Sequence, residues 1–574
     1  MKASDYIADF LQAQGVGQVF EVVGGMITHL VDSLHCRGKV RLVSVRHEQA
    51  AAFAADAVGR MTGIPGVALA TSGPGATNLL TGIGSCYFDS SPAVFITGQV
   101  NRHEQKGSSG VRQLGFQETD IVAMAGPVTK AAWRVQSAEE IASRLREAFR
   151  LATEGRPGPV LLDIPMDLQR ASVAGEAALA TGSPGAEHTG KEALSGLADA
   201  LRRAQRPLII AGGGIAAGRA NGAFRSVAEA LGVPVVCSLL GVDALPAAHP
   251  LRVGMLGSYG NRWANLAVGR ADFLLVLGSR LDIRQTGAMT DAFKGDRVVF
   301  HVDCDPSEVN NRVRGCVPVI AQLRPFLEAL LAELGSERGL ARRPDWLAEI
   351  AGLKAQWPDT MELKDAPGIN PNVFMHRLSA HSRPTAAYVV DVGQHQMWAA
   401  QSLQLEDHQR FLTSGGMGAM GFALPAAIGA AMVARGAPTV MIAGDGGFQL
   451  NLQELQTVAQ HRVPVKMVIL NNRCHGMVRQ FQESYFEQRY ASTMWGYSAP
   501  DFERVAHAYG IAAATVSEPT MIESALGAMW ADPAAPYLLQ VMIDPLANAY
   551  PKIAFGHPMT EMEPFAKPLE MEGT

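Results

Sequence analysis

Asp445 and Asn472 are the two residues whose types and spacing point most directly to chemistry. Asp445 stands in a glycine run directly after an apolar stretch, and Asn472 follows the next apolar stretch. Carboxylate and amide oxygens suit Mg²⁺, which in proteins usually shares its coordination shell with phosphates. Glycines let a backbone approach a phosphate closely, and those around the aspartate are Gly444, Gly446 and Gly447. The pair therefore predicts a site for Mg²⁺ and a phosphorylated ligand.

A strand, a helix and a second strand must position these two residues. Residues 439–443 and 465–470 are short apolar runs typical of strands, and residues 450–461 carry apolar side chains at helical spacing. In such a βαβ unit both strands end on one edge of a parallel sheet, where α/β proteins bind ligands. A helix beginning near Gly447 would add free N–H groups for an anion. The alternative is a turn and a helix cap without a metal.

The sequence around this unit resembles a known family. The Gly-Asp-Gly turn with its Asn-Asn pair, the segment TSGGMGAMGFALPAAIGAA at 413–431 and the segment DVGQHQMWAAQ at 391–401 are similar to the large subunit of acetolactate synthase. The resemblance runs from about residue 5 to about residue 563. It implies an α/β fold of three doubly wound parallel-sheet domains. It also implies thiamine diphosphate, Mg²⁺ and a largely structural FAD as cofactors.

The resemblance places thiamine diphosphate on the glycine run and its neighbours. The metal ligands would be Asp445, Asn472 and the backbone carbonyl of Cys474. Met420 resembles the bulky residue that bends the cofactor, although it could also be a core methionine at a Gly-rich bend. His395 could contact substrate or be a buried histidine whose hydrogen bonds are satisfied. The residues implied to bind this cofactor are Val392, Gly393, Gln394, His395, Gly418, Met420, Gly444, Asp445, Gly446, Gly447, Asn472, Gly476 and Met477.

Glu48 is the residue implied to begin catalysis. It lies in RHEQAAAFAADAVGR, which is similar to the family segment whose glutamate hydrogen-bonds the N1′ nitrogen of the aminopyrimidine ring. Judged alone, Glu48 is a carboxylate that the dipole favours at a helix N-terminus. The run GFQE at 115–118 resembles the family's FQE, in which Phe and Gln line the active site. Besides Met420, the catalytic candidates are Gly25, Glu48, Phe116 and Gln117.

Three predicted strand ends between residues 211 and 305 present glycines, arginines and acids that could hold a nucleotide. Gly212, Gly214 and Ala217 fit GxGxxA, but no acid ends the next strand, so an NAD-dependent dehydrogenase is a weak alternative. GSRLDIRQTG and HVDCDPSE are similar to the family's FAD motifs, although Ile283 and Gln322 each stand where the family has Asp. The residues implied to bind FAD are Gly212, Gly213, Gly214, Gly278, Arg280, Arg284, Asp303, Cys304, Gly415 and Gly416.

The residues that would contact the acceptor differ in part from those of the family that the sequence resembles. Arg284 resembles the family's arginine for the acceptor carboxylate, and Val478 lies in the neighbouring MVRQF segment. Met166 replaces a lysine, however, and Phe481 replaces a tryptophan. The expected reaction decarboxylates pyruvate and joins the two-carbon unit to a second pyruvate, giving 2-acetolactate. The two replacements leave open a ketone or keto-sugar acceptor. The shared cofactor residues leave open a non-ligating 2-keto-acid decarboxylase or oxidase.

The chain has 574 residues, which is too long for one hydrophobic core. We expect a pyrimidine-binding domain at 1–175, a central FAD-binding-like domain at 190–340 and a diphosphate- and Mg²⁺-binding domain at 368–550. Residues 171–190 are small and aperiodic, which is typical of a linker. The tail at 551–574 would be either a flap over the site or a partner contact.

Composition narrows the class further. The net charge is −5 without a basic stripe, which argues against nucleic acid as a partner. The N-terminus lacks a basic start before an apolar run, and no apolar run reaches the roughly 20 residues that span a bilayer. The six cysteines are scattered without a CxxC pair, as expected of a reduced cytoplasmic protein. The resemblance also implies self-association, with Glu48 and Asp445 of opposite chains meeting in one site. A regulatory small subunit is left open.

Overall fold

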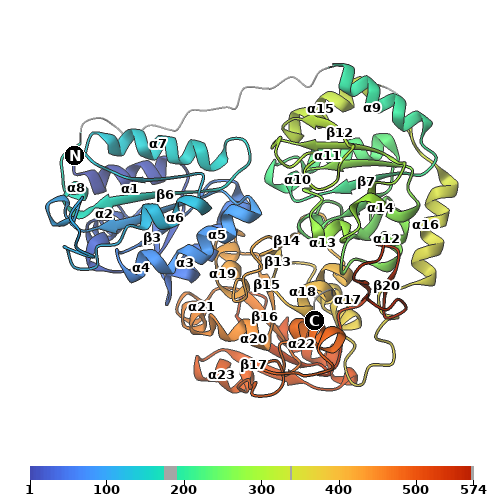
Figure 1. Ribbon diagram of the computed structural model, residues 1–574. Coiled ribbons are helices and arrows are strands. Elements are labelled where there is room, and N and C mark those ends of the chain that lie inside the picture. Colours follow the sequence, from blue (N-terminus) through green and yellow to red (C-terminus); the bar gives the residue numbers. More distant parts are fainter. Residues whose placement is uncertain (174–190, 336–338, 570–574) are drawn as a thin grey trace.

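The computed structural model describes residues 1–173, 191–335 and 339–569, which form three units, each on its own six-stranded sheet (Figure 1). All strand pairs in these three sheets are parallel. Their inner strands are apolar on both faces because helices cover both sides of each sheet. The predicted α/β class with three parallel-sheet units is confirmed. Residues 174–190 of the predicted linker lie outside the described residues.

The N-terminal unit (residues 1–173) has the strand order 2-1-3-4-6-5. Across the sheet its strands are β2 (Arg41–Ser44), β1 (Gln18–Val22), β3 (Gly66–Ala70), β4 (Ala93–Gln99), β6 (Pro159–Pro165) and β5 (Ala131–Arg134). Its helices are α1 (Ala3–Ala13), α2 (Thr28–Arg37), α3 (Glu48–Thr62), α4 (Pro74–Asn78), α5 (Leu80–Asp89), α6 (Ile121–Ala125), α7 (Glu140–Thr153) and α8 (Met166–Gln169).

The C-terminal unit (residues 371–542) repeats this order. Across the sheet its strands are β14 (Arg410–Thr413), β13 (Ala387–Val390), β15 (Thr439–Gly444), β16 (Val465–Asn471), β18 (Tyr537–Met542) and β17 (Ala512–Val516). Its helices are α17 (Pro371–His381), α18 (Gln394–Ser402), α19 (Ala423–Val433), α20 (Asp445–Gln449), α21 (Leu455–His461), α22 (Gly476–Tyr485), α23 (Phe502–Ala508) and α24 (Ile522–Met529).

The central unit (residues 191–356) has the different order 3-2-1-4-5-6, which is that of dinucleotide-binding folds. Across the sheet its strands are β9 (Arg252–Met255), β8 (Val235–Cys237), β7 (Pro207–Ala211), β10 (Phe273–Leu277), β11 (Val298–Asp303) and β12 (Val317–Ile320). Its helices are α9 (Lys191–Arg203), α10 (Gly214–Ala217), α11 (Asn221–Leu231), α12 (Arg262–Arg270), α13 (Ile283–Thr286), α14 (Thr290–Lys294), α15 (Leu323–Leu334) and α16 (Pro344–Gln356).

The strand orders predict where ligands bind, because connections run to opposite faces of a sheet at the point where the order reverses. In the N-terminal and C-terminal units this point lies between the first and third strands, namely β1 and β3, and β13 and β15. In the central unit it lies between β7 and β10. The glycine-rich turns of the sequence follow these same strands.

Helices α3 and α19 join the N-terminal unit to the C-terminal unit. Both helices are rich in small residues, and a Cβ added at Gly429 would overlap the carbonyl oxygen of Ala54. Phe53 and Phe422 pack edge to face beside this contact, with ring centroids 5.4 Å apart. The close backbone approach fixes the two sheets relative to each other.

The predicted helix at 450–461 is wrong in its extent. Helix α20 begins earlier, at Asp445, and ends at Gln449; after a break at residues 450–451, a 3-10 turn (Leu452–Glu454) leads into α21, which begins at Leu455. Asn451 accounts for the break, because its buried side chain donates to the Gly421 carbonyl oxygen (2.8 Å) and to Gln49 Oε1 (3.1 Å). These bonds tie the turn to the N-terminal unit at the expense of a continuous helix.

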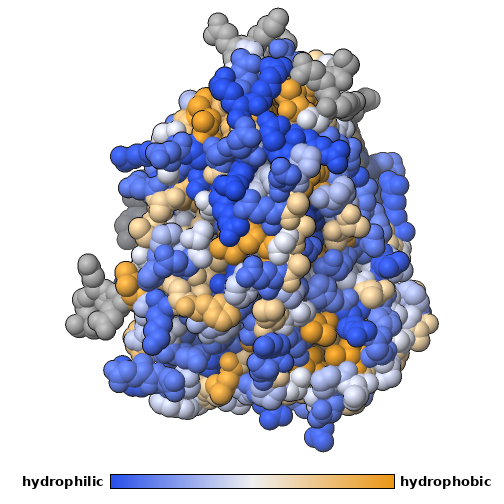
Figure 2. All heavy atoms as spheres, turned by 90° about the vertical axis from the view of Figure 1, so that its right-hand side faces the viewer, coloured by the Kyte–Doolittle hydropathy of each residue, from blue (hydrophilic) through white to orange (hydrophobic). Residues whose placement is uncertain are grey.

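The described part of the tail lies against the central unit. Strands β19 (Lys552–Ile553) and β20 (Met562–Glu563) form an antiparallel hairpin, and Arg262 Nη2 donates to the Glu563 carbonyl oxygen at 2.9 Å. The side of the molecule that carries α16 is mostly hydrophilic, with hydrophobic residues in small separate groups (Figure 2). None of the helices in the described ranges has the length and apolar character that crossing a membrane requires.

Candidate active site

A cavity of about 660 Å³ lies between the carboxyl ends of the central and C-terminal sheets. All thirteen residues predicted to bind thiamine diphosphate line it, as do Cys474 and Val478. Of the ten predicted FAD residues, all but Gly212 and Gly416 line it as well. The structure therefore brings two predicted ligand sites, from two separate sheets, into one continuous space.

Three oxygen atoms at one end of this cavity form an arrangement that suits a cation. Asn472 Oδ1 lies 3.2 Å from Asp445 Oδ1 and 2.9 Å from the Cys474 carbonyl oxygen. Oxygens in adjacent octahedral positions around Mg²⁺ are also about 3 Å apart, given metal–oxygen distances of about 2.1 Å. In the described part of the chain, no group of three or more His, Cys, Asp or Glu side chains could hold a metal. This site instead combines one carboxylate with amide and carbonyl oxygens.

Gln394 decides which way the Asn472 amide faces. If the amide were turned over, Nδ2 would donate to both facing oxygens and no cation would be needed. Gln394 Nε2, however, donates to the Ala547 carbonyl oxygen (3.0 Å) and to Gln480 Oε1 (3.2 Å), which leaves Gln394 Oε1 facing Asn472. Asn472 Nδ2 donates to that oxygen at 3.1 Å. The amide oxygen must then face the other two acceptors, and a bound cation relieves their repulsion.

Burial and one hydrogen bond change the acidity of the Asp445 carboxyl. The Tyr497 hydroxyl donates to Asp445 Oδ2 at 2.8 Å, and burial raises the pKa of the Asp445 carboxyl to about 6. A divalent cation would favour the ionised form of this carboxyl. Tyr497 was not predicted, because its segment carries no periodic pattern or motif.

His395 lines the cavity and carries a buried polar atom without a partner. Its Nε2 is buried and has no hydrogen-bond partner among the described residues. Burial lowers the pKa of the imidazole to about 3, so the ring is neutral at pH 7. A Cβ at Gly393 would lie 2.6 Å from the ring, and one at Gly444 would lie 2.9 Å from Nδ1. The unpaired nitrogen does not fit a histidine whose hydrogen bonds are all satisfied, and the ligand contact stays a prediction.

The glycines at the central end of the cavity have two different roles. A Cβ at Gly212 would overlap the Gly278 carbonyl oxygen, so this glycine permits the ends of β7 and β10 to pack closely. Gly213 and Gly214 line the cavity, as do Arg280 and Asp303, and a Cβ at Gly214 would also lie 2.7 Å from Gly278 Cα. Gln322, one of the two departures in this region, also lines the wall. Glycines, a cation and hydroxyl-binding oxygens at a strand-order reversal suit a dinucleotide such as FAD.

Arg156 also lines the central end of the cavity, although the sequence analysis did not single it out. It comes from the N-terminal unit, in the turn between α7 and β6, and its Nη1 pairs with Glu308 at 2.7 Å and Asp305 at 3.3 Å. The run Gly-Arg-Pro-Gly that contains it was a possible signal. All three units therefore contribute to the cavity wall.

Glu48 lies elsewhere, at the carboxyl edge of the N-terminal sheet. It is the first residue of α3, and its Oε2 accepts a hydrogen bond from Asn78 Nδ2 at 2.9 Å. A Cβ at Gly75 would lie 3.2 Å from Oε1 and 2.8 Å from Thr71 Cγ2. The carboxyl group is buried at 8% exposure, with one oxygen engaged by the protein.

The other catalytic candidates gather at this same edge. Gly25 opens a short helical turn whose next residue, Met26, donates its backbone N–H to Thr71 Oγ1 at 3.3 Å. Gln117 has a φ of +65°, which is uncommon for a residue with a side chain and is often found at functional sites. Phe116 beside it is 78% exposed. None of the four N-terminal candidates lines the cavity of its own chain.

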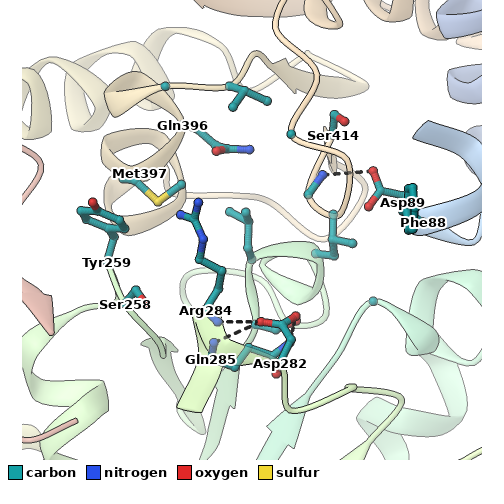
Figure 3. Close-up of a pocket in the computed structure, with 18 of the residues that line it drawn as sticks. Phe88, Asp89, Ser258, Tyr259, Asp282, Arg284, Gln285, Gln396, Met397 and Ser414 are labelled. Atoms are coloured by element: carbon teal, nitrogen blue, oxygen red, sulfur yellow. Dashed lines mark hydrogen bonds between the residues drawn. The ribbon is translucent and has the colours of Figure 1, made fainter. Parts of the chain in front are cut away.

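Only some of the residues predicted to contact the acceptor lie in the cavity wall. Arg284 points into the space between Tyr259, Met397 and Gln396, while its backbone N–H is held by Asp282 Oδ1 at 2.9 Å (Figure 3). Phe481 does not line the cavity and packs against Tyr485, with ring centroids 4.8 Å apart. Met166 starts α8 in the N-terminal unit and lies outside the cavity wall.

Comparisons with known proteins agree with this arrangement. Family models of the thiamine pyrophosphate enzymes match the chain in order: the N-terminal TPP binding domain at 1–124, the central domain at 194–330 and the C-terminal TPP binding domain at 391–541. The central match includes the glycines on which the dehydrogenase alternative rested.

Curated relatives extend the agreement over nearly the whole chain. The acetolactate synthase isozyme 2 large subunit of Escherichia coli (strain K12) is 38% identical over 98% of this chain and 99% of its own length. The isozyme 3 large subunit of the same organism is 36% identical over 98% of each chain, and the acetolactate synthase large subunit of Parasynechococcus marenigrum is 37% identical over 97% and 90%. The chain belongs to the acetolactate synthase large-subunit family and is a thiamine pyrophosphate-dependent enzyme.

Proposed function

We propose that this enzyme decarboxylates pyruvate and transfers the remaining two-carbon unit to a second pyruvate, forming 2-acetolactate. The observation that carries the proposal is the cavity in which the Asp445 oxygen cluster and the Arg284 guanidinium share one space. Thiamine diphosphate supplies the nucleophilic carbon and the electron-accepting ring when it is bound. Arg284 would bind and orient the acceptor carboxylate, because a guanidinium matches the two carboxylate oxygens.

The residues of this chain divide the remaining tasks. Asp445, Asn472 and the Cys474 carbonyl would hold Mg²⁺, and His395, which lines the same space, would lie beside the diphosphate. Because Asn78 engages Oε2 of Glu48, Oε1 is the atom that would hold and return a proton. FAD would bind at the central end, where Arg156, Arg280 and Asp303 line the wall. The overall reaction involves no net oxidation or reduction, so the flavin would have a structural role.

Two copies of the chain would complete each active site. Glu48 and its neighbours lie outside the cavity of their own chain, so a second chain would have to present them. Large hydrophobic side chains are exposed in the loop that carries Phe116, at the end of α20 and at the cavity wall, where they would be covered by such a contact. They include Phe116 at 78%, Leu114 at 61%, Leu450 at 54% and Val478 at 53%. This supports a self-associating enzyme.

A ketone or keto-sugar acceptor is the second candidate, favoured by Met166 and Phe481. A methionine gives no positive charge for a keto-acid carboxylate, and Phe481 packs against Tyr485 and does not line the cavity. Each such difference is worth about 1–3 kcal/mol in discrimination between substrates.

Product analysis tests both candidates. Purified protein would be given thiamine diphosphate, Mg²⁺, FAD and pyruvate, with and without cyclohexane-1,2-dione. Acetolactate as the main product under both conditions supports the proposal. A tertiary alcohol from the ketone supports the second candidate. Acetaldehyde alone, or flavin reduction by pyruvate, would contradict both and indicate a decarboxylase or an oxidase.

A further inference from the structure

Residues 414–416 form part of the cavity wall at the place where the three units meet. Ser414 and Gly415 line the cavity. A Cβ added at Gly415 would lie 3.0 Å from the Leu240 side chain of the central unit, and one added at Gly416 would lie 2.8 Å from Phe88 of the N-terminal unit. The segment is thus clamped between two other units and has no room for side chains of its own at these glycines.

Asp89 anchors this segment through its backbone. Asp89 is the last residue of α5, and its side chain is fully buried. Its Oδ2 accepts the Gly415 N–H at 3.0 Å, and its Oδ1 accepts the Gly416 N–H at 2.6 Å. Figure 3 shows the carboxylate facing the segment from the N-terminal unit. Both carboxylate oxygens therefore bind the cavity wall of another unit.

Arg60 supplies the charge that lets Asp89 stay buried. Its Nη2 lies 3.0 Å from Asp89 Oδ2, and its Nη1 donates to the Thr413 carbonyl oxygen at 2.8 Å. Asp56, one helical turn away on α3, binds the other side of the guanidinium with Oδ1 2.5 Å from Nε. Buried charges persist when they are paired and hydrogen-bonded in this way. Asp56 and Asp89 share the ion cluster, but only Asp89 holds the segment.

The cluster extends to the central unit. Arg410 Nη1 donates to the Arg60 carbonyl oxygen at 3.2 Å, and Arg410 Nε donates to Asp243 Oδ2 at 2.7 Å. Polar contacts thus run from Asp243 of the central unit through Arg410 of the C-terminal unit to Arg60 and Asp89 of the N-terminal unit. The segment they surround leads directly to Gly418 and Met420 in the cavity wall.

We infer that Asp89 is a positioning residue that fixes residues 414–416 in the shape required to admit the cofactors. The inference rests on the proposed cofactor sites and goes beyond them: Asp89 lines the cavity itself, but both of its carboxylate oxygens are engaged by the backbone N–H groups of Gly415 and Gly416. Replacing one carboxylate oxygen with an amide turns an acceptor into a donor, so Asp89→Asn sets an N–H group against the Gly415 or Gly416 N–H.

The test compares Asp89→Asn with Asp56→Asn as its matched control. Both changes neutralise a buried partner of Arg60, but only the first alters the bonds to the segment. Affinity for thiamine diphosphate with Mg²⁺ would be measured by tryptophan fluorescence, and affinity for FAD by flavin fluorescence. Asp89→Asn should weaken the binding of at least one cofactor about ten- to hundredfold, while Asp56→Asn stays within about threefold of the unaltered protein. Turnover of Asp89→Asn should recover when cofactor is raised to saturation.

Equal affinities in the two variants, whether unchanged or equally weakened, would overturn the positioning role and leave the proposed function intact. Failure of the unaltered protein to bind thiamine diphosphate would overturn both. If Asp89→Asn does not fold, Gly416→Ala takes its place. Its added methyl group would lie 2.8 Å from Phe88 Cβ and 3.0 Å from Asp89 Oδ1, which displaces the segment without removing any charge from the ion cluster, and it should cause the same loss of affinity. Full affinity in Gly416→Ala would then contradict the inference.

Discussion

Gly476→Ala should disable the metal site without removing any of its ligands. Gly476 is the first residue of α22, and a Cβ there would overlap Gln394 Oε1 and lie 2.6 Å from Asn472 Nδ2. Those two atoms make the hydrogen bond that turns the Asn472 amide oxygen towards Asp445. The added methyl group therefore acts on the orientation of a ligand.

The size of the effect follows from how firmly Gln394 is held. It cannot move freely, because its Nε2 is bonded to Gln480 and to the Ala547 carbonyl oxygen. Forcing a methyl group into a packed site costs about 1–3 kcal/mol, and the lost amide hydrogen bond costs about 1 kcal/mol. If the Asn472 amide rotates by 180°, its Nδ2 group replaces the oxygen ligand and repels the cation. Together these costs come to about 2–4 kcal/mol, and since 1.4 kcal/mol is a factor of ten, Mg²⁺ and thiamine diphosphate should bind about 30- to 700-fold more weakly.

The assay is a titration of the apoprotein with Mg²⁺ at fixed thiamine diphosphate, followed by tryptophan fluorescence. Gly527→Ala is the matched control, since Gly527 lies within α24 and its added Cβ would meet nothing within 4 Å. The control should bind as the unaltered protein does and be more stable by up to about 1 kcal/mol. If Gly476→Ala bound Mg²⁺ as tightly as this control, the assigned amide orientation would be refuted.

Three further changes test separate parts of the site. Glu48→Gln should bind cofactors within a few-fold of normal but turn over pyruvate about 10²–10⁴ times more slowly, since its proton-holding oxygen is gone; normal turnover at saturating cofactor would contradict that role. Asp445→Ala should lose Mg²⁺ and thiamine diphosphate together in calorimetric titration, and unaltered affinity would disprove the metal assignment. Burial raises the pKa of Asp391 from 3.8 to about 7, so this carboxyl stabilises the fold most below pH 4 and loses that contribution as pH rises through 7. Between pH 5 and pH 9 the unfolding free energy of Asp391→Asn should rise relative to the unaltered protein by about 2–3 kcal/mol, and a difference independent of pH in denaturant unfolding would refute this.

Much of the fold could be predicted because strand and helix patterns alternate along the chain. The pattern shows that the sheets are parallel, but not how the strands are ordered within them. The central unit orders its strands differently from the two outer units, and that difference arises from long-range packing. The break before α21 was also beyond the pattern. It depends on Asn451 binding Gly421 and Gln49, which are distant in sequence.

The cavity residues were predictable where glycines and polar residues follow a strand. Gly444 to Gly447 and Asn472 show this most clearly, because a strand end and a close backbone approach leave a readable signature. The separation of Glu48 from the cavity of its own chain was expected from the resemblance alone. No residue pattern places α3 relative to β15, since that depends on how α3 packs against α19.

Asp89 left a different kind of signal, which sequence reasoning overlooked. An acid at the last position of a helix is disfavoured by the helix dipole, which places partial negative charge there. Asp89 occupies that position in α5, is buried, and would be destabilising if judged from its own helix alone. Arg60 and the two N–H groups of the neighbouring unit reverse the balance. When a residue is unfavourable in its own helix or strand, contacts from elsewhere in the fold must offset that cost. Such residues are found most often at functional sites. The acid at the end of α5 should therefore matter to the cofactor cavity more than to the helix that carries it.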